Sequence, residues 1–242
     1  MPTSYRELDA DRIVQTLELL SRRIHERFPG SSLSGVSRDL LAFGREIEGR
    51  LASIARPNWT IRGLSILTAV VVLTLLGFAV ATIRVSPHVQ GLSDLAQGIE
   101  SAINDVAFLA IGLFFLFTIE IRLKRRVALR ALHELRSIAH IVDMHQLTKD
   151  PEQVLDPEMT RTASSPPRVM SRFELTRYLD YCSELLSLVG KLASLHAQFL
   201  PDHVILTAVN DIESLSVGLS RKIWQKIVIL DTIGAGSGPD QH

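Results

Sequence analysis

The feature that most constrains this chain is a long stretch, residues 113–150, that contains neither glycine nor proline. As an α-helix its 38 residues would extend over about 57 Å, roughly twice the thickness of the hydrocarbon layer of a membrane. The stretch begins within an uncharged apolar run, residues 106–119, that favours a membrane span. A helix that starts there must leave the lipid, so we expect a span that leads directly into a helical domain.

An earlier run, residues 64–83, is the second apolar segment that the fold must place. Its twenty residues carry no charge and lie between Arg62 and Arg84. That length matches the hydrocarbon thickness when the segment is helical, and a soluble helix without a polar face would be unusual. The sequence therefore predicts a transmembrane hairpin: helices over residues 61–84 and 105–123, joined by a short extracytoplasmic loop over residues 85–104.

Four charged residues at the ends of these spans are candidates for intramembrane ion pairs. In an antiparallel hairpin Arg62 would lie near Glu120, and Arg84 would lie near Asp105. The two arginines are about 33 Å apart along a helix and the two acids about 22 Å apart, so both pairs cannot form without helix tilt or extended side chains. We therefore expect at most one tight pair.

Basic residues indicate the orientation of the hairpin. Four arginines within residues 45–62 accompany the start of the first span and five basic residues follow the second, whereas only Arg84 lies between the spans. The positive-inside rule then places both termini in the cytoplasm, in a multi-pass protein of the cell (inner) membrane. The basic residues after the second span are also candidates for contact with lipid or another anion: Arg122, Lys124, Arg125, Arg126 and Arg130.

Outside the spans the sequence predicts amphipathic helices. Ser4 and Glu7 have the spacing of a capping box and would begin a helix that ends at Phe28. A second amphipathic helix, residues 36–54, ends before Pro57. We expect these two helices to form an N-terminal αα-hairpin that needs a partner to bury its apolar face.

The chain after the second span predicts a helical bundle. A seam over residues 128–142 continues the second span, residues 150–170 form a connection rich in Pro, Ser and Thr, and Ser171 with Glu174 forms a capping box. Apolar positions at steps of three and four, typical of coiled-coil packing, then mark one helix at Leu175, Tyr178, Cys182, Leu185, Val189, Leu192, His196 and Phe199. They mark a last helix at Ile205, Val209, Ile212, Leu215, Leu219, Ile223, Ile227 and Leu230.

No segment alternates with the period of a strand, so the predicted fold class is an all-α membrane protein. It consists of a two-transmembrane-helix hairpin and a cytoplasmic helical bundle. The predicted parts are an N-terminal cytoplasmic αα-hairpin (1–57), the membrane hairpin, a cytoplasmic bundle that continues from its second helix (124–232) and a disordered tail (233–242).

A polar stripe in the bundle is the best candidate for chemistry. His133, Arg136, His140 and Asp143 recur at steps of three and four and therefore share a helix face. Two histidines and an aspartate are transition-metal ligands in principle, yet the histidines lie about 10 Å apart along the axis, too far for one ion without further ligands. A solvated or interhelical polar face explains the stripe as well, and we predict no metal or other cofactor.

Other residues point away from catalysis. Cys182 and His196 both occupy seam positions, which indicates an inert buried thiol and a core histidine. The chain lacks a nucleophile-base pair, a metal-ligand motif and paired carboxylates at catalytic spacing. Its 26 basic and 26 acidic residues give no overall field that would attract nucleic acid. We therefore expect neither an enzyme nor a nucleic-acid-binding protein.

The remaining function classes are a scaffold and a channel. The seams favour a membrane-anchored scaffold or interaction protein that forms homo-oligomers or binds a protein partner, with the bilayer as its first contact. The alternative is a small oligomeric channel or membrane-perturbing effector, gated by the bundle. Its pore would be lined by Ser65, Thr68, Thr74 and Thr82, but neither span contains a deep acidic ring that would select cations.

Overall fold

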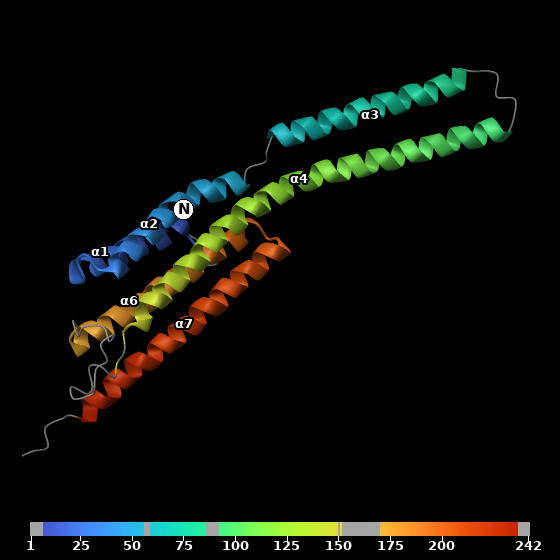
Figure 1. Ribbon diagram of the computed structural model, residues 1–242. Coiled ribbons are helices and arrows are strands. Elements are labelled where there is room, and N and C mark those ends of the chain that lie inside the picture. The colour runs from blue at the N-terminus through green and yellow to red at the C-terminus, as the bar shows by residue number, and fades with distance from the viewer. Residues whose placement is uncertain (1–6, 56–58, 86–91, 150, 152–169, 237–242) are drawn as a thin grey trace, which may run out of the picture. The chain divides into compact units, whose positions relative to one another are not determined.

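The computed structural model describes residues 7–55, 59–85, 92–149, 151 and 170–236. Within these ranges every regular element is an α-helix (Figure 1). The helices are α1 (Ala10–Arg27), α2 (Ser32–Ala55), α3 (Trp59–Val85), α4 (Leu92–Leu147), α6 (Arg172–Phe199) and α7 (His203–Gly236). The helical fold class predicted from the sequence is confirmed for this part of the chain.

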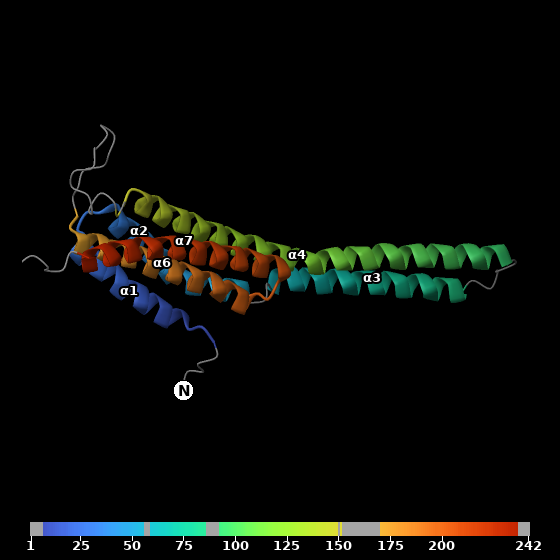
Figure 2. The same ribbon diagram turned by 90° about the horizontal axis from the view of Figure 1, so that it is seen from below.

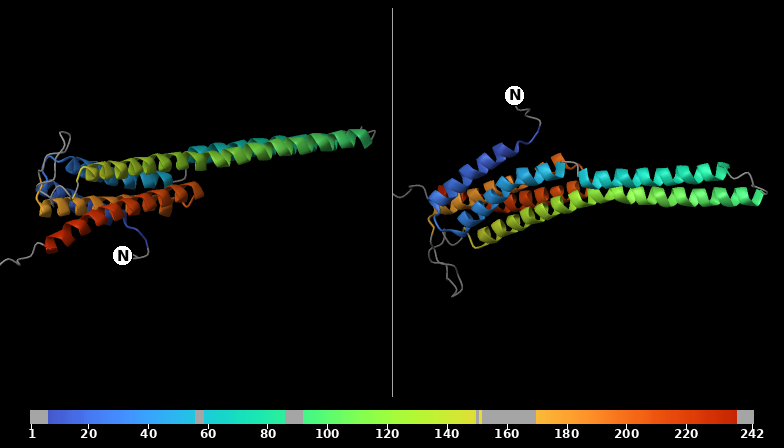
Figure 3. Two further views of the ribbon diagram at one scale, coloured as in Figure 1. Left: turned by 60° about the horizontal axis from the view of Figure 1, so that its bottom comes forward. Right: turned by 90° about the horizontal axis from the view of Figure 1, so that it is seen from above.

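The helices form two compact units, and α4 contributes to both. Met1–Ala55 and Val127–His242 make one unit, called here the bundle, and Arg56–Arg126 makes the other, called here the hairpin. In the hairpin, α3 and the first part of α4 run antiparallel, side by side (Figure 3). Judged on the residues that the structure describes, no helix is both long enough and apolar enough to cross a membrane.

Two predicted boundaries at the hairpin and at the N-terminus are wrong. The loop expected over residues 85–104 cannot extend that far, because α4 begins at Leu92. The first helix begins at Ala10, where the side chain of Asp9 accepts a hydrogen bond of 3.2 Å from the backbone N–H of Arg12 and caps the helix. Ser4, the expected capping residue, lies outside the described residues.

The bundle has one hydrophobic core, built around α6. This helix contacts α1, α2 and α7 (Figure 2), and it buries more than the predicted seam, since Leu179, Leu186 and Leu195 are also fully buried. The N-terminal αα-hairpin was expected to pack near the C-terminal helices, and the two contribute to the same core. The partner that α1 and α2 need is therefore α6.

The predicted seams agree with the observed core in nearly every position. On α6 all eight positions are buried except Phe199, which is 41% exposed. On α7 all are buried except Leu215, which packs partly buried against the core. Ser171 and Glu174 form the predicted capping box of α6. The tail is helical through Gly236 rather than disordered from residue 233, while residues 237–242 and most of the expected connection at 150–170 lie outside the described residues.

Candidate functional site

Glu120 is the centre of a charged cluster in the hairpin. Its Oε2 atom lies 3.1 Å from Nε of Arg62 in the first turn of α3, and its Oε1 atom lies 3.0 Å from Nζ of Lys124 on α4. The side chains of Glu120 and Lys124 are only 13% and 18% exposed, whereas that of Arg62 is 52% exposed. We call these three residues the Glu120 cluster.

The cluster follows from the antiparallel pairing of α3 with α4 and from helix periodicity. Lys124 is four residues after Glu120, so both side chains lie on one face of α4. Arg62 was predicted from the sequence as a partner of Glu120, but Lys124 was not. The spacing of four residues between Glu120 and Lys124 could have indicated this second pair. The side chains of Arg84 and Asp105, the other candidate pair, lie outside those that the structure describes.

The remaining basic residues of the predicted anion-binding group differ in their surroundings. Arg122 and Arg126 are exposed, and neither has a carboxylate partner within the part of the chain that the structure describes. Arg125 is half-buried, and Arg130 is exposed on the part of α4 that belongs to the bundle. Arg122 and Arg126 are four residues apart and therefore share a helix face.

Large apolar side chains are exposed on both helices of the hairpin. On α3 they occupy about half of the helix circumference at 100° per residue, and on the first part of α4 they occupy a similar share. Their exposed fractions lie between 47% and 74%. The residues are Leu64, Ile66, Leu67, Val70, Val71, Leu73 and Phe78 on α3, and Ile103, Val106, Phe108, Ile111, Phe114 and Phe115 on α4.

Three threonines of the hairpin use their hydroxyl groups within their own helices. Thr68 donates to the carbonyl oxygen of Leu64 at 2.9 Å, and Thr74 donates to that of Val70 at 2.8 Å. Thr118 of α4 makes the same contact four residues back, at 2.6 Å. These hydroxyl donors are satisfied without water. Of the other proposed pore-lining residues, Ser65 is buried and the side chain of Thr82 lies outside the described ones.

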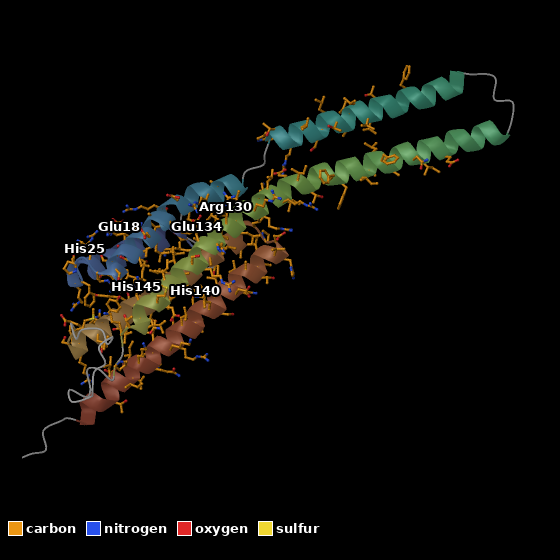
Figure 4. All side chains as sticks on the ribbon, viewed as in Figure 1. Glu18, His25, Arg130, Glu134, His140 and His145 are labelled. Carbon is orange, nitrogen blue, oxygen red and sulfur yellow. The ribbon has the colours of Figure 1, made fainter. Side chains whose placement is uncertain are left out.

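The polar stripe of α4 lies on the part of the helix that belongs to the bundle. His133, Arg136 and His140 are exposed, and Asp143 accepts a hydrogen bond of 2.7 Å from Nε2 of Gln146. Figure 4 shows His140 on α4 together with Arg130 and Glu134. Among the described residues, no group of three or more His, Cys, Asp or Glu side chains is arranged to hold a metal ion.

His133 lines a groove of about 430 Å³ between α2 and α4, together with Asp39 and Glu46. Two of the carboxylates in this groove are already engaged by Arg50, which donates to Glu134 at 2.9 Å and to Glu46 at 2.8 Å. The hydrogen bond that Arg50 donates to the Glu134 carboxylate is the main reason why the pKa of Arg50 is raised above its usual value. The groove is therefore an ion-pair network that joins α2 to α4.

A second groove, of about 440 Å³, lies between α1 and α6. Ile13, Leu20 and Leu188 are its buried apolar residues, and charged side chains surround them. At its edge the backbone of Leu8 makes two hydrogen bonds with the side-chain amide of Gln198, at 3.0 and 3.3 Å. These bonds hold the segment before α1 against α6.

Cys182 and His196 are both in the core, as expected. Burial raises the pKa of the Cys182 thiol to about 12, so the thiol stays protonated and unreactive at neutral pH. The Nδ1 atom of His196 lies 3.1 Å from the carbonyl oxygen of Leu192, but its buried Nε2 atom has no hydrogen-bond partner among the residues that the structure describes. His196 is thus a core histidine that is only half satisfied.

No family model, characterised protein or solved structure matches this chain. Its function must therefore be inferred from the surfaces described above.

Proposed function

We propose that this protein is a membrane-anchored helical scaffold whose hairpin lies in the bilayer and whose bundle carries out interactions in the cytoplasm. The observation that carries the proposal is the apolar surface of the hairpin. A water-soluble monomer rarely exposes a continuous apolar surface of this extent, and full burial of a Leu, Ile, Val or Phe side chain is worth about 1.5–3 kcal/mol. Lipid would cover both helices at once.

The polar groups of the hairpin are compatible with lipid. Thr68, Thr74 and Thr118 donate to backbone carbonyl groups, as is required where water is absent. The charged side chains of the Glu120 cluster lie at one end of the apolar surface, where an ion pair can form at the membrane interface. Trp59 is the first residue of α3, and its side chain is 76% exposed. A tryptophan at this position is suited to the same membrane interface.

The helix lengths also support two spans. The 27 residues of α3 would extend about 40 Å, more than the hydrocarbon thickness of about 30 Å. Because α4 begins at Leu92, the second span is no longer limited to the 14 residues after Asp105. Residues 101–119 form a stretch of 19 with Asp105 as the only charge.

None of the helices, in the part of the chain that the structure describes, is both long enough and apolar enough to cross a membrane. The proposal relies on the full sequence run from residue 64 to residue 83, which continues past the last described side chain of α3, Phe78. The membrane hairpin and its orientation, with both termini in the cytoplasm, are therefore tested directly by the labelling experiment below.

The scaffold role is supported by the bundle. Its grooves contain no catalytic constellation among the described residues. On α7 the side chains of Val217, Trp224 and Val228 are 59%, 63% and 42% exposed and lie at steps of seven and four, so they share a face. We assign this face to self-association or to a protein partner, since aromatic residues are enriched at such interfaces.

Topology can be tested with single cysteines, because Cys182 is the only native one. In a Cys182→Ala background, we would place a cysteine at Arg38 on α2, at Gln225 on α7 or at Gln90 between α3 and α4. An impermeant maleimide on sealed vesicles should label R38C and Q225C from one face and Q90C from the opposite face. Labelling of all three from the same face would overturn the membrane hairpin.

Membrane integration can be tested with a matched pair of variants. Leu73→Arg puts a charge into the apolar surface of α3, whereas Leu206→Arg puts one on an exposed position of α7. A charge near the centre of a span costs about 2.5–3.5 kcal/mol on insertion, so L73R should shift protein from the carbonate-resistant to the extractable fraction and L206R should not. Equal extraction of both variants and of the wild type would contradict the proposal.

A further inference from the structure

Charge is strongly segregated along the hairpin. One end of the hairpin contains the start of α3 and the residues around 120–126 of α4, and it carries six basic residues and one acidic residue. The opposite end, around the link between α3 and α4, carries one basic residue and three acidic residues. The first group comprises Arg56, Arg62, Arg122, Lys124, Arg125, Arg126 and Glu120, and the second comprises Arg84, Asp94, Glu100 and Asp105. A single carboxylate cannot neutralise the basic end.

The contacts of Glu120 show which basic residues remain available. Glu120 engages Arg62 and Lys124, at 3.1 and 3.0 Å. Arg122 and Arg126 are exposed and have no carboxylate partner among the described residues. These two guanidinium groups, one helical turn apart on α4, therefore present uncompensated charge at the end of the apolar surface.

Given the membrane hairpin proposed above, on which this inference rests, we infer that Arg122 and Arg126 bind the phosphate groups of anionic phospholipids. Guanidinium groups form paired hydrogen bonds with phosphate oxygens. Basic residues beside a span lie at the depth of the headgroups and are attracted to a leaflet that contains anionic lipid. The hairpin thus selects anionic lipid at its cytoplasmic end, while Glu120 holds Arg62 and Lys124 in the contact between α3 and α4.

The two tryptophans of the chain allow a local test. Trp59 is three residues before Arg62, so the Arg62–Glu120 pair places it at the same end of the hairpin as Arg122 and Arg126. Trp224 lies in the bundle and is 63% exposed, so Trp224→Phe leaves Trp59 as the only tryptophan with little effect on packing. Brominated lipids quench tryptophan fluorescence at short range, and the quenching of Trp59 then reports which lipids surround this end of the hairpin.

The full chain carrying W224F would be reconstituted into mixed vesicles of phosphatidylcholine and phosphatidylglycerol, with the bromine on one lipid or the other. Brominated phosphatidylglycerol should quench more than its mole fraction predicts, with an enrichment of about fivefold for each arginine. R122Q/R126Q should abolish the enrichment. The control R221Q/K222Q, which removes the same charge from two exposed positions of α7, should retain it.

The outcomes separate this inference from the proposed function. If Trp59 is quenched by brominated lipid of either kind in proportion to its mole fraction, the hairpin is in the membrane but the anionic-lipid contact is wrong. Retained enrichment in R122Q/R126Q would also overturn the assignment of these two residues. If neither brominated lipid quenches Trp59, then the membrane hairpin and the lipid contact both fail. Loss of the enrichment at high salt is expected, because the attraction is electrostatic.

Discussion

Lys226 of α7 donates a hydrogen bond of 2.9 Å from Nζ to the carbonyl oxygen of Gln146 in the last turn of α4. A second bond of 3.1 Å joins the same Nζ atom to the carbonyl oxygen of Lys149, just beyond the helix. The last carbonyl groups of a helix have no partner within it, and a cation placed there also interacts favourably with the helix dipole. Lys226 therefore ties the end of α4 to α7 in the bundle.

Replacement of Lys226 by Met should lower the free energy of unfolding of the bundle by about 1–2 kcal/mol, because two carbonyl groups lose a charged donor. A Trp59→Phe background would leave Trp224 as the only tryptophan, and its fluorescence would follow unfolding of the bundle in denaturant. Lys222→Met, an exposed lysine one turn earlier on α7, is the matched control and should change stability little. Equal effects of the two variants would show that the cap adds nothing.

The buried imidazole of His196 should make the bundle sensitive to acid. Burial lowers the pKa of His196 below its usual value of 6.5, and the nearby charge of Arg50 lowers it further. The unfolded chain then binds the proton more readily than the folded chain. The neutral His196 side chain therefore makes its full contribution to the free energy of unfolding above about pH 6.5, and this contribution decreases as the pH falls below that value.

The measurement for His196 compares the pH dependence of unfolding in the wild type and in His196→Leu. The variant removes the titrating group, so its stability should fall less between about pH 7 and pH 5. His145, whose pKa is also lowered by burial and by Lys149, is present in both proteins and does not affect the difference. An unchanged slope in H196L would contradict the assignment, and His140→Gln, at an exposed position, controls for loss of a histidine.

Periodicity made much of the bundle predictable from the sequence, because each helix there buries one continuous apolar face. The seams of α6 and α7 and the Ser171–Glu174 capping box were found this way. Two kinds of information were missing. Several residues near a helix start can cap it, so Asp9 was passed over for Ser4. The start of α4 at Leu92 was missed because residues 92–104 contain Gly98 and only weak apolar periodicity.

Charged contacts were predictable only where sequence spacing fixes them. The Arg62–Glu120 pair followed from the expected antiparallel hairpin, and the Lys124–Glu120 pair follows from a spacing of four. The contacts of Lys226 with α4, or of Arg50 with Glu134, join residues about 80 positions apart and depend on how the helices pack. The position of α6 in the centre of the core was also not predictable from spacing. Its sequence shows one apolar seam, whereas in the structure it packs against α1, α2 and α7.

Two glycines of α2 should respond to substitution in opposite directions. A Cβ atom at the exposed Gly49 would meet no atom within 4 Å, so Gly49→Ala should raise the free energy of unfolding by about 0.5–1 kcal/mol through helix propensity. At the buried Gly44 a Cβ atom would lie 3.4 Å from Cδ2 of Leu17 and 3.5 Å from Cγ2 of Val14, so Gly44→Val should overpack the α1–α2 contact and cost about 1–3 kcal/mol. Denaturant unfolding of both variants checks the signs, and a G44V protein as stable as wild type would show that α1 does not pack tightly there.

The Glu120 cluster should show different responses to loss of the acid and to loss of one base. Glu120→Ala leaves Arg62 and Lys124 as neighbouring like charges, whereas Arg62→Ala leaves the Lys124–Glu120 pair in place. E120A should therefore destabilise the contact between α3 and α4 by about 1 kcal/mol more than R62A does. Thermal unfolding in detergent, followed by Trp59 fluorescence in the Trp224→Phe background, measures the difference.

Salt provides the sign test for this prediction. Added salt screens repulsion between Arg62 and Lys124, so it should recover part of the stability lost in E120A. In R62A the remaining interaction is attractive, and salt should weaken it slightly. If both variants respond to salt in the same direction, Glu120 does not act by separating two cations, and the cluster does not fix the pairing of α3 with α4.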